Sequence, residues 1–151
     1  MISIKSDREI ELMRRAGQIV GDTHNYIKKY IKPGITTIEL DRLAEAFIRK
    51  CGATPSFKGL YGFPNACCIS VNEEVVHGIP SNRKLKDGDI VSIDIGACYQ
   101  GYHGDSAWSY PVGKVNQEKE LLLKHTEESL FEGLSVIRDG IRVGDIGYAV
   151  S

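Results

Sequence analysis

The chain has 151 residues, the size of one ordinary domain, and its 20 acidic and 19 basic side chains nearly cancel. No basic stripe interrupts the pattern, so the sequence gives no sign of a partner such as nucleic acid or an anionic membrane. No apolar signal segment or run of membrane-spanning length occurs, and the cysteines lack the spacing of a zinc site or a disulfide framework. We expect a cytoplasmic protein whose cysteines are reduced and mostly buried.

Two amphipathic helices are predicted in the first fifty residues. Ser6–Glu9 and Thr36–Glu39 are capping boxes, and each precedes apolar residues at helical spacing. The first helix is expected from Asp7 to Ile31, and the second ends before Gly52. The apolar stripe of the first helix comprises Ile10, Met13, Gly17, Val20, His24, Ile27 and Ile31. Within it, we interpret His24 as a core histidine rather than a ligand.

A segment rich in glycine, proline and aromatic residues follows, from Pro55 to Asn65. It cannot be regular structure over its length, and it leaves two interpretations open. It is either an ordinary loop packed on the core or one wall of an apolar substrate pocket. Its large apolar side chains are Phe57, Leu60, Tyr61 and Phe63. Beyond a strand at Ala66–Val71, we expect His77 to project from a strand end into a cavity.

The strongest local pattern is a β-hairpin with strands Ile90–Cys98 and Tyr102–Tyr110, joined at Gln100-Gly101. A two-residue loop that ends in glycine is typical of tight hairpins. Pairing outward from this loop sets Tyr99 opposite Tyr102, and the rest of the register follows from it.

In that register, Gly96 lies opposite Asp105 and Asp94 lies opposite Ala107. Because side chains alternate faces, Asp94, Gly96 and Asp105 share one face, with the two aspartate β-carbons roughly 7–8 Å apart. Two such carboxylates can hold one cation, or bridge two about 3.5–4 Å apart, and Gly96 would leave the space between them open. Alternatively, Asp94 lies on a solvated face and Asp105 belongs to a turn; a β-bulge would also undo the geometry.

The last forty residues predict a helix from Gln117 to Ile137 and another that begins at Val143. The first should bury Leu123, Leu130, Leu134 and Ile137, with His125 solvated. A short echo links Ile31–Ile35 to Ile137–Ile141, which suggests a duplicated unit of two helices followed by strands. We expect residues 1–112 to form a first α/β half and residues 113–151 to begin a second. Since the chain stops inside an amphipathic helix, we expect the front portion of a longer protein.

Three segments together carry a family resemblance: N-A-C-C-I-S-V-N-E-E-V-V-H-G-I-P, L-K-D-G-D-I-V-S-I-D-I-G and G-Y-H-G-D-S-A. The chain resembles the N-terminal portion of a bacterial type I methionine aminopeptidase. This resemblance implies an α/β (α+β) "pita-bread" fold with pseudo-symmetric halves. It also implies removal of the initiator methionine from nascent polypeptides, with the ribosome as the place of action. The implied cofactors are two divalent metal ions, whether cobalt, manganese, iron, zinc or nickel. Prolidases and creatinase share the fold, but V-H-G-I-P favours the aminopeptidase.

The resemblance also implies roles for individual residues. Asp94 and Asp105 match the first two metal ligands of the family, with Asp105 bridging both ions. His77 matches the histidine that contacts the substrate and helps to stabilise the tetrahedral intermediate. The methionine pocket would be lined by Phe57, Leu60, Phe63 and Cys68.

The family's remaining ligands, a histidine and two glutamates, lie in the second half, and neither Glu127 nor Glu128 is assigned to them. We therefore expect little turnover from this chain alone. An inactive or non-catalytic binding module of the same fold stays open as the alternative.

Overall fold

The computed structural model describes residues 3–151 and forms two compact units, one ending at Lys114 and the other beginning at Val115. The first unit contains α1 (Asp7–Ile27), η1 (Lys28–Tyr30), α2 (Thr37–Lys50), β1 (Thr54–Pro55), η2 (Leu60–Gly62), β2 (Cys67–Val71), β3 (Ile90–Tyr99) and β4 (Tyr102–Pro111). The second contains α3 (Gln117–Ser135) and α4 (Val143–Val150). None of the helices in the described part is long and apolar enough to cross a membrane.

Strand β3 is the centre of a four-stranded antiparallel sheet and pairs with each of the other strands. The predicted hairpin register is confirmed: Tyr99 pairs with Tyr102, Gly96 with Asp105, and Asp94 with Ala107. Gln100 and Gly101 have φ angles of 49° and 85°, and such a pair of positive values suits a two-residue turn whose twist matches the strands.

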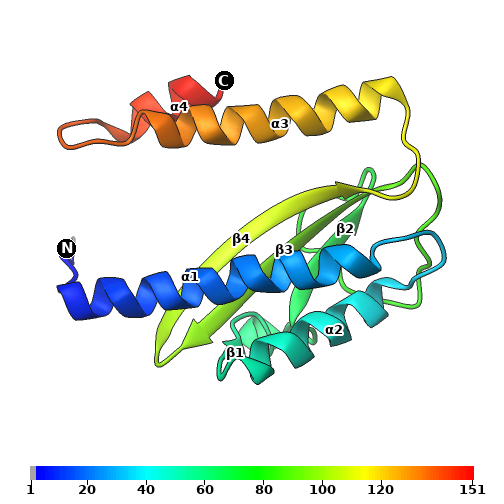
Figure 1. Cartoon of the computed structure of the whole chain (residues 1–151), viewed down its shortest axis with the longest axis horizontal. Coiled ribbons are helices and arrows are strands. Elements are labelled where there is room, and N and C mark those ends of the chain that lie inside the picture. Colours follow the sequence, from blue (N-terminus) through cyan, green and yellow to red (C-terminus); the bar gives the residue numbers. More distant parts are fainter. Residues whose placement is uncertain (1–2) are drawn as a thin grey trace. The chain divides into compact units, whose positions relative to one another are not determined.

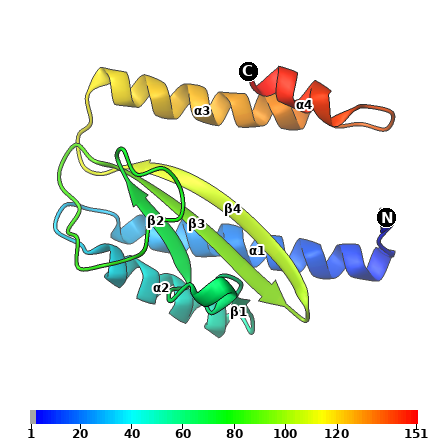
Figure 2. The same cartoon turned by 180° about the vertical axis from the view of Figure 1, so that it is seen from behind.

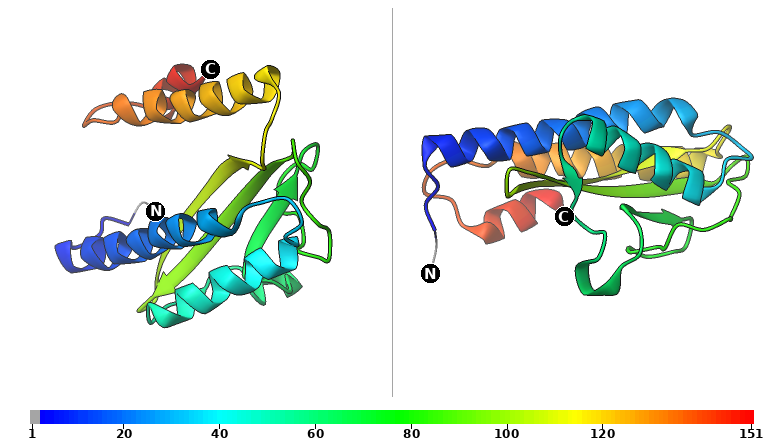
Figure 3. Two further views of the ribbon diagram at one scale, coloured as in Figure 1. Left: turned by 45° about the vertical axis from the view of Figure 1, so that its right-hand side comes forward. Right: turned by 90° about the horizontal axis from the view of Figure 1, so that it is seen from below.

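Helices α1 and α2 cover one face of the sheet, as Figure 1 shows. The edge-on view in Figure 3 places both helices on one side of the strands and the segment that carries η2 on the other. The helix-facing residues of β3 are buried, namely Val91, Ile93, Ile95 and Ala97. Where α1 crosses β4 the two backbones come into contact, because a β-carbon built on Gly104 would lie 2.4 Å from the Gly17 nitrogen.

Both capping boxes are confirmed, but α1 ends at Ile27 rather than Ile31 and passes into η1. The predicted apolar stripe is wrong in its first half, since Ile10 and Met13 are 43% and 41% exposed. In Figure 1 the first turns of α1 project past the end of the hairpin, so the sheet covers only the later turns. The residues buried there are Ala16, Ile19, Val20, Thr23, His24 and Ile27.

In the second unit, Asn116 caps α3, but the helix ends at Ser135, and of the predicted buried stripe only Leu123 is even partly buried. Leu130, Leu134 and Ile137 are 43%, 51% and 55% exposed. Helix α4 packs against α3 at Gly133, where a β-carbon would lie 2.6 Å from Val150 Cγ2. The interpretation of residues 1–112 and 113–151 as parts of two pseudo-symmetric halves stays a prediction.

Candidate metal and substrate site

A cavity of about 520 Å³ lies on the face of the sheet opposite the helices. The segment that links β1 to β2 folds back over this face (Figure 2). One wall comes from that segment and consists of Phe57, Leu60, Tyr61, Gly62, Phe63 and Pro64. The rest of the lining consists of Cys68, His77, Ile79, Asp94 and Asp105. The fold therefore gathers all seven site residues suggested by the sequence around one cavity.

Asp94 on β3 and Asp105 on β4 are the carboxylates of this cavity. Oδ1 of Asp94 is buried and has no hydrogen-bond partner. The pKa of Asp94 is raised from 3.8 to about 6, chiefly by burial, then by the charge of Asp105 and a hydrogen bond shared with it, while His77 opposes the rise.

A buried carboxylate oxygen without a donor is costly unless a cation neutralises it, and carboxylate oxygens are common ligands of divalent metals. The carboxylate pair therefore fits a metal ion as part of a ligand set. Within residues 3–151 there is no group of three or more histidine, cysteine, aspartate or glutamate side chains that could hold one. A complete metal site would therefore need ligands in addition to Asp94 and Asp105.

Gly96, opposite Asp105, does not leave open space, which corrects the expectation from sequence. A β-carbon at Gly96 would lie 2.6 Å from Cε1 of Phe57 and 2.8 Å from Cβ of Ser56. The absent side chain is thus replaced by the Phe57 ring, which lies directly on the strand. Apolar wall and carboxylates are in this way brought next to each other.

His77 lies on an exposed loop rather than at a strand end, with a φ angle of 60°. The loop is tied to β2, because the Ile69 nitrogen donates to the Gly78 oxygen at 2.9 Å and the Gly78 nitrogen donates to Ser70 Oγ at 3.1 Å. A β-carbon on Gly78 would lie 2.3 Å from the Ile69 oxygen, so only glycine fits this approach. The positive φ of His77 is a strained conformation for a residue with a side chain, and it is held beside a glycine that is bonded to β2.

The segment that forms the apolar wall is anchored to α2 at two points. The buried Asp41 carboxylate accepts hydrogen bonds from Asn65 Nδ2 and from the Ala66 and Cys67 nitrogens, at 2.8–2.9 Å. Lys58 pairs with Glu45 at 2.8 Å. These anchors hold the wall in place although Leu60 and Tyr61 are exposed, which favours the pocket-wall interpretation over a loop packed only on the core.

The cysteine and histidine expectations largely hold. All four cysteines are free; Cys67 and Cys68 are buried, and Cys51 and Cys98 are partly exposed. Burial, followed by the charges of Asp94 and Asp105, raises the pKa of Cys68 to about 11, so this cavity residue stays a neutral thiol.

His24 is a satisfied core histidine: Nε2 donates to the Ser106 oxygen and Nδ1 accepts from the Tyr110 hydroxyl, both at 3.0 Å. Sequence reasoning missed Ile79, which lines the cavity, and the contact between Ser56 and His103 beside it. The two-residue alternation that placed Asp105 also places His103 on the same face, so that signal was available.

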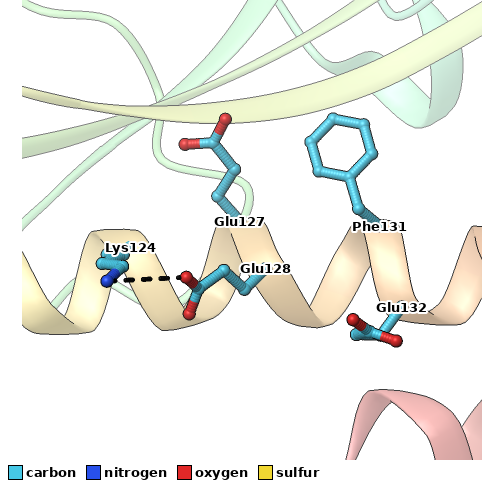
Figure 4. A pocket seen from close by; sticks show the side chains of 5 residues that line it. All are labelled: Lys124, Glu127, Glu128, Phe131 and Glu132. Atoms are coloured by element: carbon cyan, nitrogen blue, oxygen red, sulfur yellow. Dashed lines mark ion pairs between the residues drawn. The ribbon is translucent and has the colours of Figure 1, made fainter.

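A second hollow, of about 320 Å³, lies on α3 and is drawn in Figure 4. Its lining consists of Lys124, Glu127, Glu128, Phe131 and Glu132. In Figure 4 the glutamates point in different directions along one helix, and Lys124 Nζ lies 3.7 Å from Glu128 Oε1. His125 is exposed and contacts Glu128, as expected of a solvated residue. This hollow is an ordinary charged helix face.

Comparison with known proteins agrees with this geometry. Methionine aminopeptidase 1 of Bacillus subtilis (strain 168) is 58% identical over 150 residues, which are 99% of this chain and 60% of the relative. The crystal structure of methionine aminopeptidase from Rickettsia prowazekii has a TM-score of 0.97 at 38% identity, over 99% of this chain and 60% of that one. Prolidase from Pyrococcus furiosus has a TM-score of 0.87 at 23% identity, over 97% and 42% respectively, and shares the fold.

The expected resemblance and the pita-bread fold are thereby confirmed, while the chain spans about 60% of the length of the methionine aminopeptidases it matches. The model of metallopeptidase family M24 matches residues 11–151. The family match, the pita-bread fold, and the carboxylate pair beside an apolar wall agree with one another. This chain belongs to metallopeptidase family M24.

Proposed function

We propose that this chain carries two metal ligands and the methionine pocket of a methionine aminopeptidase, which removes the initiator methionine from nascent polypeptides. The observation that carries the proposal is the cavity in which Asp94 and Asp105 adjoin an apolar aromatic wall. Substrates would be peptides and nascent chains with an N-terminal methionine. Such an enzyme would act in the cytoplasm, at or near the ribosome.

The apolar wall suits the methionine side chain, which is unbranched, flexible and polarisable. Phe57 and Phe63 offer ring surfaces to it, and Leu60 offers an aliphatic one. Cys68, as a neutral thiol, adds a small polarisable surface without a charge that would compete for a cation. The pocket would therefore select the side chain, while the carboxylate pair lies where the peptide backbone must arrive.

Asp94 and Asp105 would hold the metal, with Asp94 Oδ1 as an oxygen that has no competing protein donor. When bound, the metal ions would supply an activated water near neutral pH and polarise the scissile carbonyl. His77 lines the same cavity and would donate a hydrogen bond to the carbonyl oxygen or to the leaving nitrogen. Proton donation of this kind typically changes the rate by roughly 10²–10⁴-fold.

The deciding experiment is calorimetric titration of the purified chain with Mn²⁺, compared with Asp105→Asn and with an exposed-site control, Asp22→Asn. We expect weak Mn²⁺ binding that Asp105→Asn abolishes and Asp22→Asn retains, because Asp105 lines the cavity and Asp22 does not. Equal heats in all three proteins would refute the metal site.

The alternative is a non-catalytic binding module of the same fold, in which the carboxylates are relicts. A protein that contains this chain and takes up no Mn²⁺, yet still binds methionine-bearing peptides, would establish it. Chelator-sensitive release of methionine from a Met-Ala-Ser peptide by such a protein would exclude it.

A further inference from the structure

Ser56 and His103 join the apolar wall of the cavity to strand β4. Ser56 Oγ lies 2.8 Å from Nδ1 of His103. His103 pairs with Cys98 in the hairpin register and shares its face of the strand with Asp105, two residues later. Ser56 immediately precedes Phe57. The contact therefore connects the strand of one carboxylate to the residue beside an aromatic wall residue.

The backbone of Ser56 is also fixed to strand β3. Its nitrogen donates to the Gly96 oxygen at 2.9 Å, and its β-carbon lies 2.8 Å from the position that a Gly96 side chain would take. Phe57 lies on the same glycine, which faces Asp105 across the hairpin. Any lateral movement of Ser56 would shift the Phe57 ring from its position on Gly96.

The other side-chain anchors of the wall act elsewhere. Lys58 pairs with Glu45, and Asn65 donates to Asp41, so both reach helix α2. Within the described part of the chain, the hydrogen bond between Ser56 Oγ and His103 Nδ1 is the side-chain bond that links residues 56–64 to β4. This bond ties the wall to the strand of Asp105.

We propose that Ser56 and His103 are positioning residues, which hold the Phe57 ring on Gly96, beside the carboxylate pair, and thereby set the cavity's preference for a long unbranched side chain. This inference rests on the proposed function for its ligand. The position of the Phe57 ring, on which the inference depends, can be measured without any ligand.

The placement is tested by NMR on the 151-residue chain. An α-proton of Gly96 points at the Phe57 ring, so wild type should show a nuclear Overhauser effect between them and a ring-current shift of that proton. Ser56→Ala and His103→Ala should each weaken both signals, and the double variant should weaken them no further. Ser56→Thr keeps the hydroxyl and should retain them.

Ser109→Ala is the matched control, because Ser109 Oγ bonds Ser92 Oγ at 2.7 Å on the same sheet face, away from the wall. It should leave the Gly96 signals unchanged. If Ser56→Ala retains them as well, the positioning role is refuted.

Selectivity is measured as the ratio of the binding affinities for L-methioninamide and L-alaninamide, in the presence of Mn²⁺. Loss of one neutral hydrogen bond should reduce the preference for methioninamide by about threefold to tenfold in Ser56→Ala, and not in Ser109→Ala. An unchanged preference despite a displaced Phe57 ring would overturn the specificity role. If wild type prefers neither probe, the proposed pocket has failed, while the Gly96 signals still decide whether the pair positions Phe57.

Discussion

Asp94→Asn should stabilise the metal-free chain at neutral pH. The pKa of Asp94 is raised from 3.8 to about 6 by burial first and by Asp105 second. A carboxyl group whose pKa is higher in the folded state favours folding most when protonated. That contribution is full below about pH 4 and is lost as the pH rises through about 6.

The magnitude follows from the two pKa values. The difference between 3.8 and about 6 corresponds to about 3 kcal/mol of unfolding free energy without screening. Because the Asp94 side chain is only partly buried, solvent reduces this to about 1–1.5 kcal/mol. An asparagine keeps the shape and the hydrogen bond to Asp105 but carries no charge, so the variant should gain this amount.

The assay is urea unfolding with chelator present, at pH about 7.5 and about 4, for wild type, Asp94→Asn and the exposed control Asp22→Asn. Asp94→Asn should be more stable than wild type only at the higher pH, and Asp22→Asn should match wild type at both. Saturating Mn²⁺ in place of chelator should stabilise wild type and narrow the gap. A destabilised Asp94→Asn at neutral pH, or a gap independent of pH, would refute the reasoning.

Three further changes have defined outcomes. Gly78→Ala should lower the unfolding free energy by about 1–3 kcal/mol and shift the His77 resonances, because its β-carbon would lie 2.3 Å from a backbone oxygen; unchanged His77 resonances would contradict this. Asp41→Ala leaves three buried donors without an acceptor and should cost about 3 kcal/mol or more in chemical denaturation, against no more than about 1 kcal/mol if the anchor is dispensable. Burial lowers the pKa of His24, so wild-type stability should fall as the pH drops below 6.5, with a smaller fall in His24→Gln; equal pH profiles would refute it.

The hairpin was predictable because its turn determines its register. Once Gln100-Gly101 is recognised, the pairing of every later residue and the face of each aspartate follow from the two-residue alternation. The same argument placed Asp94 and Asp105 together. It required no knowledge of distant contacts.

What the sequence did not reveal depends on contacts between distant segments. The position of Phe57 on Gly96 arises from a loop whose path has no periodicity. The exposed stripe of α3 shows the opposite error, since an apolar pattern predicts burial only where a partner surface is present. The exposure of Ile10 and Met13 at the start of α1 has the same cause, because these turns of the helix extend beyond the sheet.

The meeting of Gly17 and Gly104 determines which side of the site can adapt to ligands. At this point the backbones of α1 and β4 touch without side chains between them. The part of β4 that carries Asp105 therefore cannot move toward the helix when a ligand binds. Ligands of different size must therefore be accommodated by movement of the apolar wall formed by the segment between β1 and β2. Variation in tolerance among relatives should accordingly track changes in residues 56–64 rather than in α1.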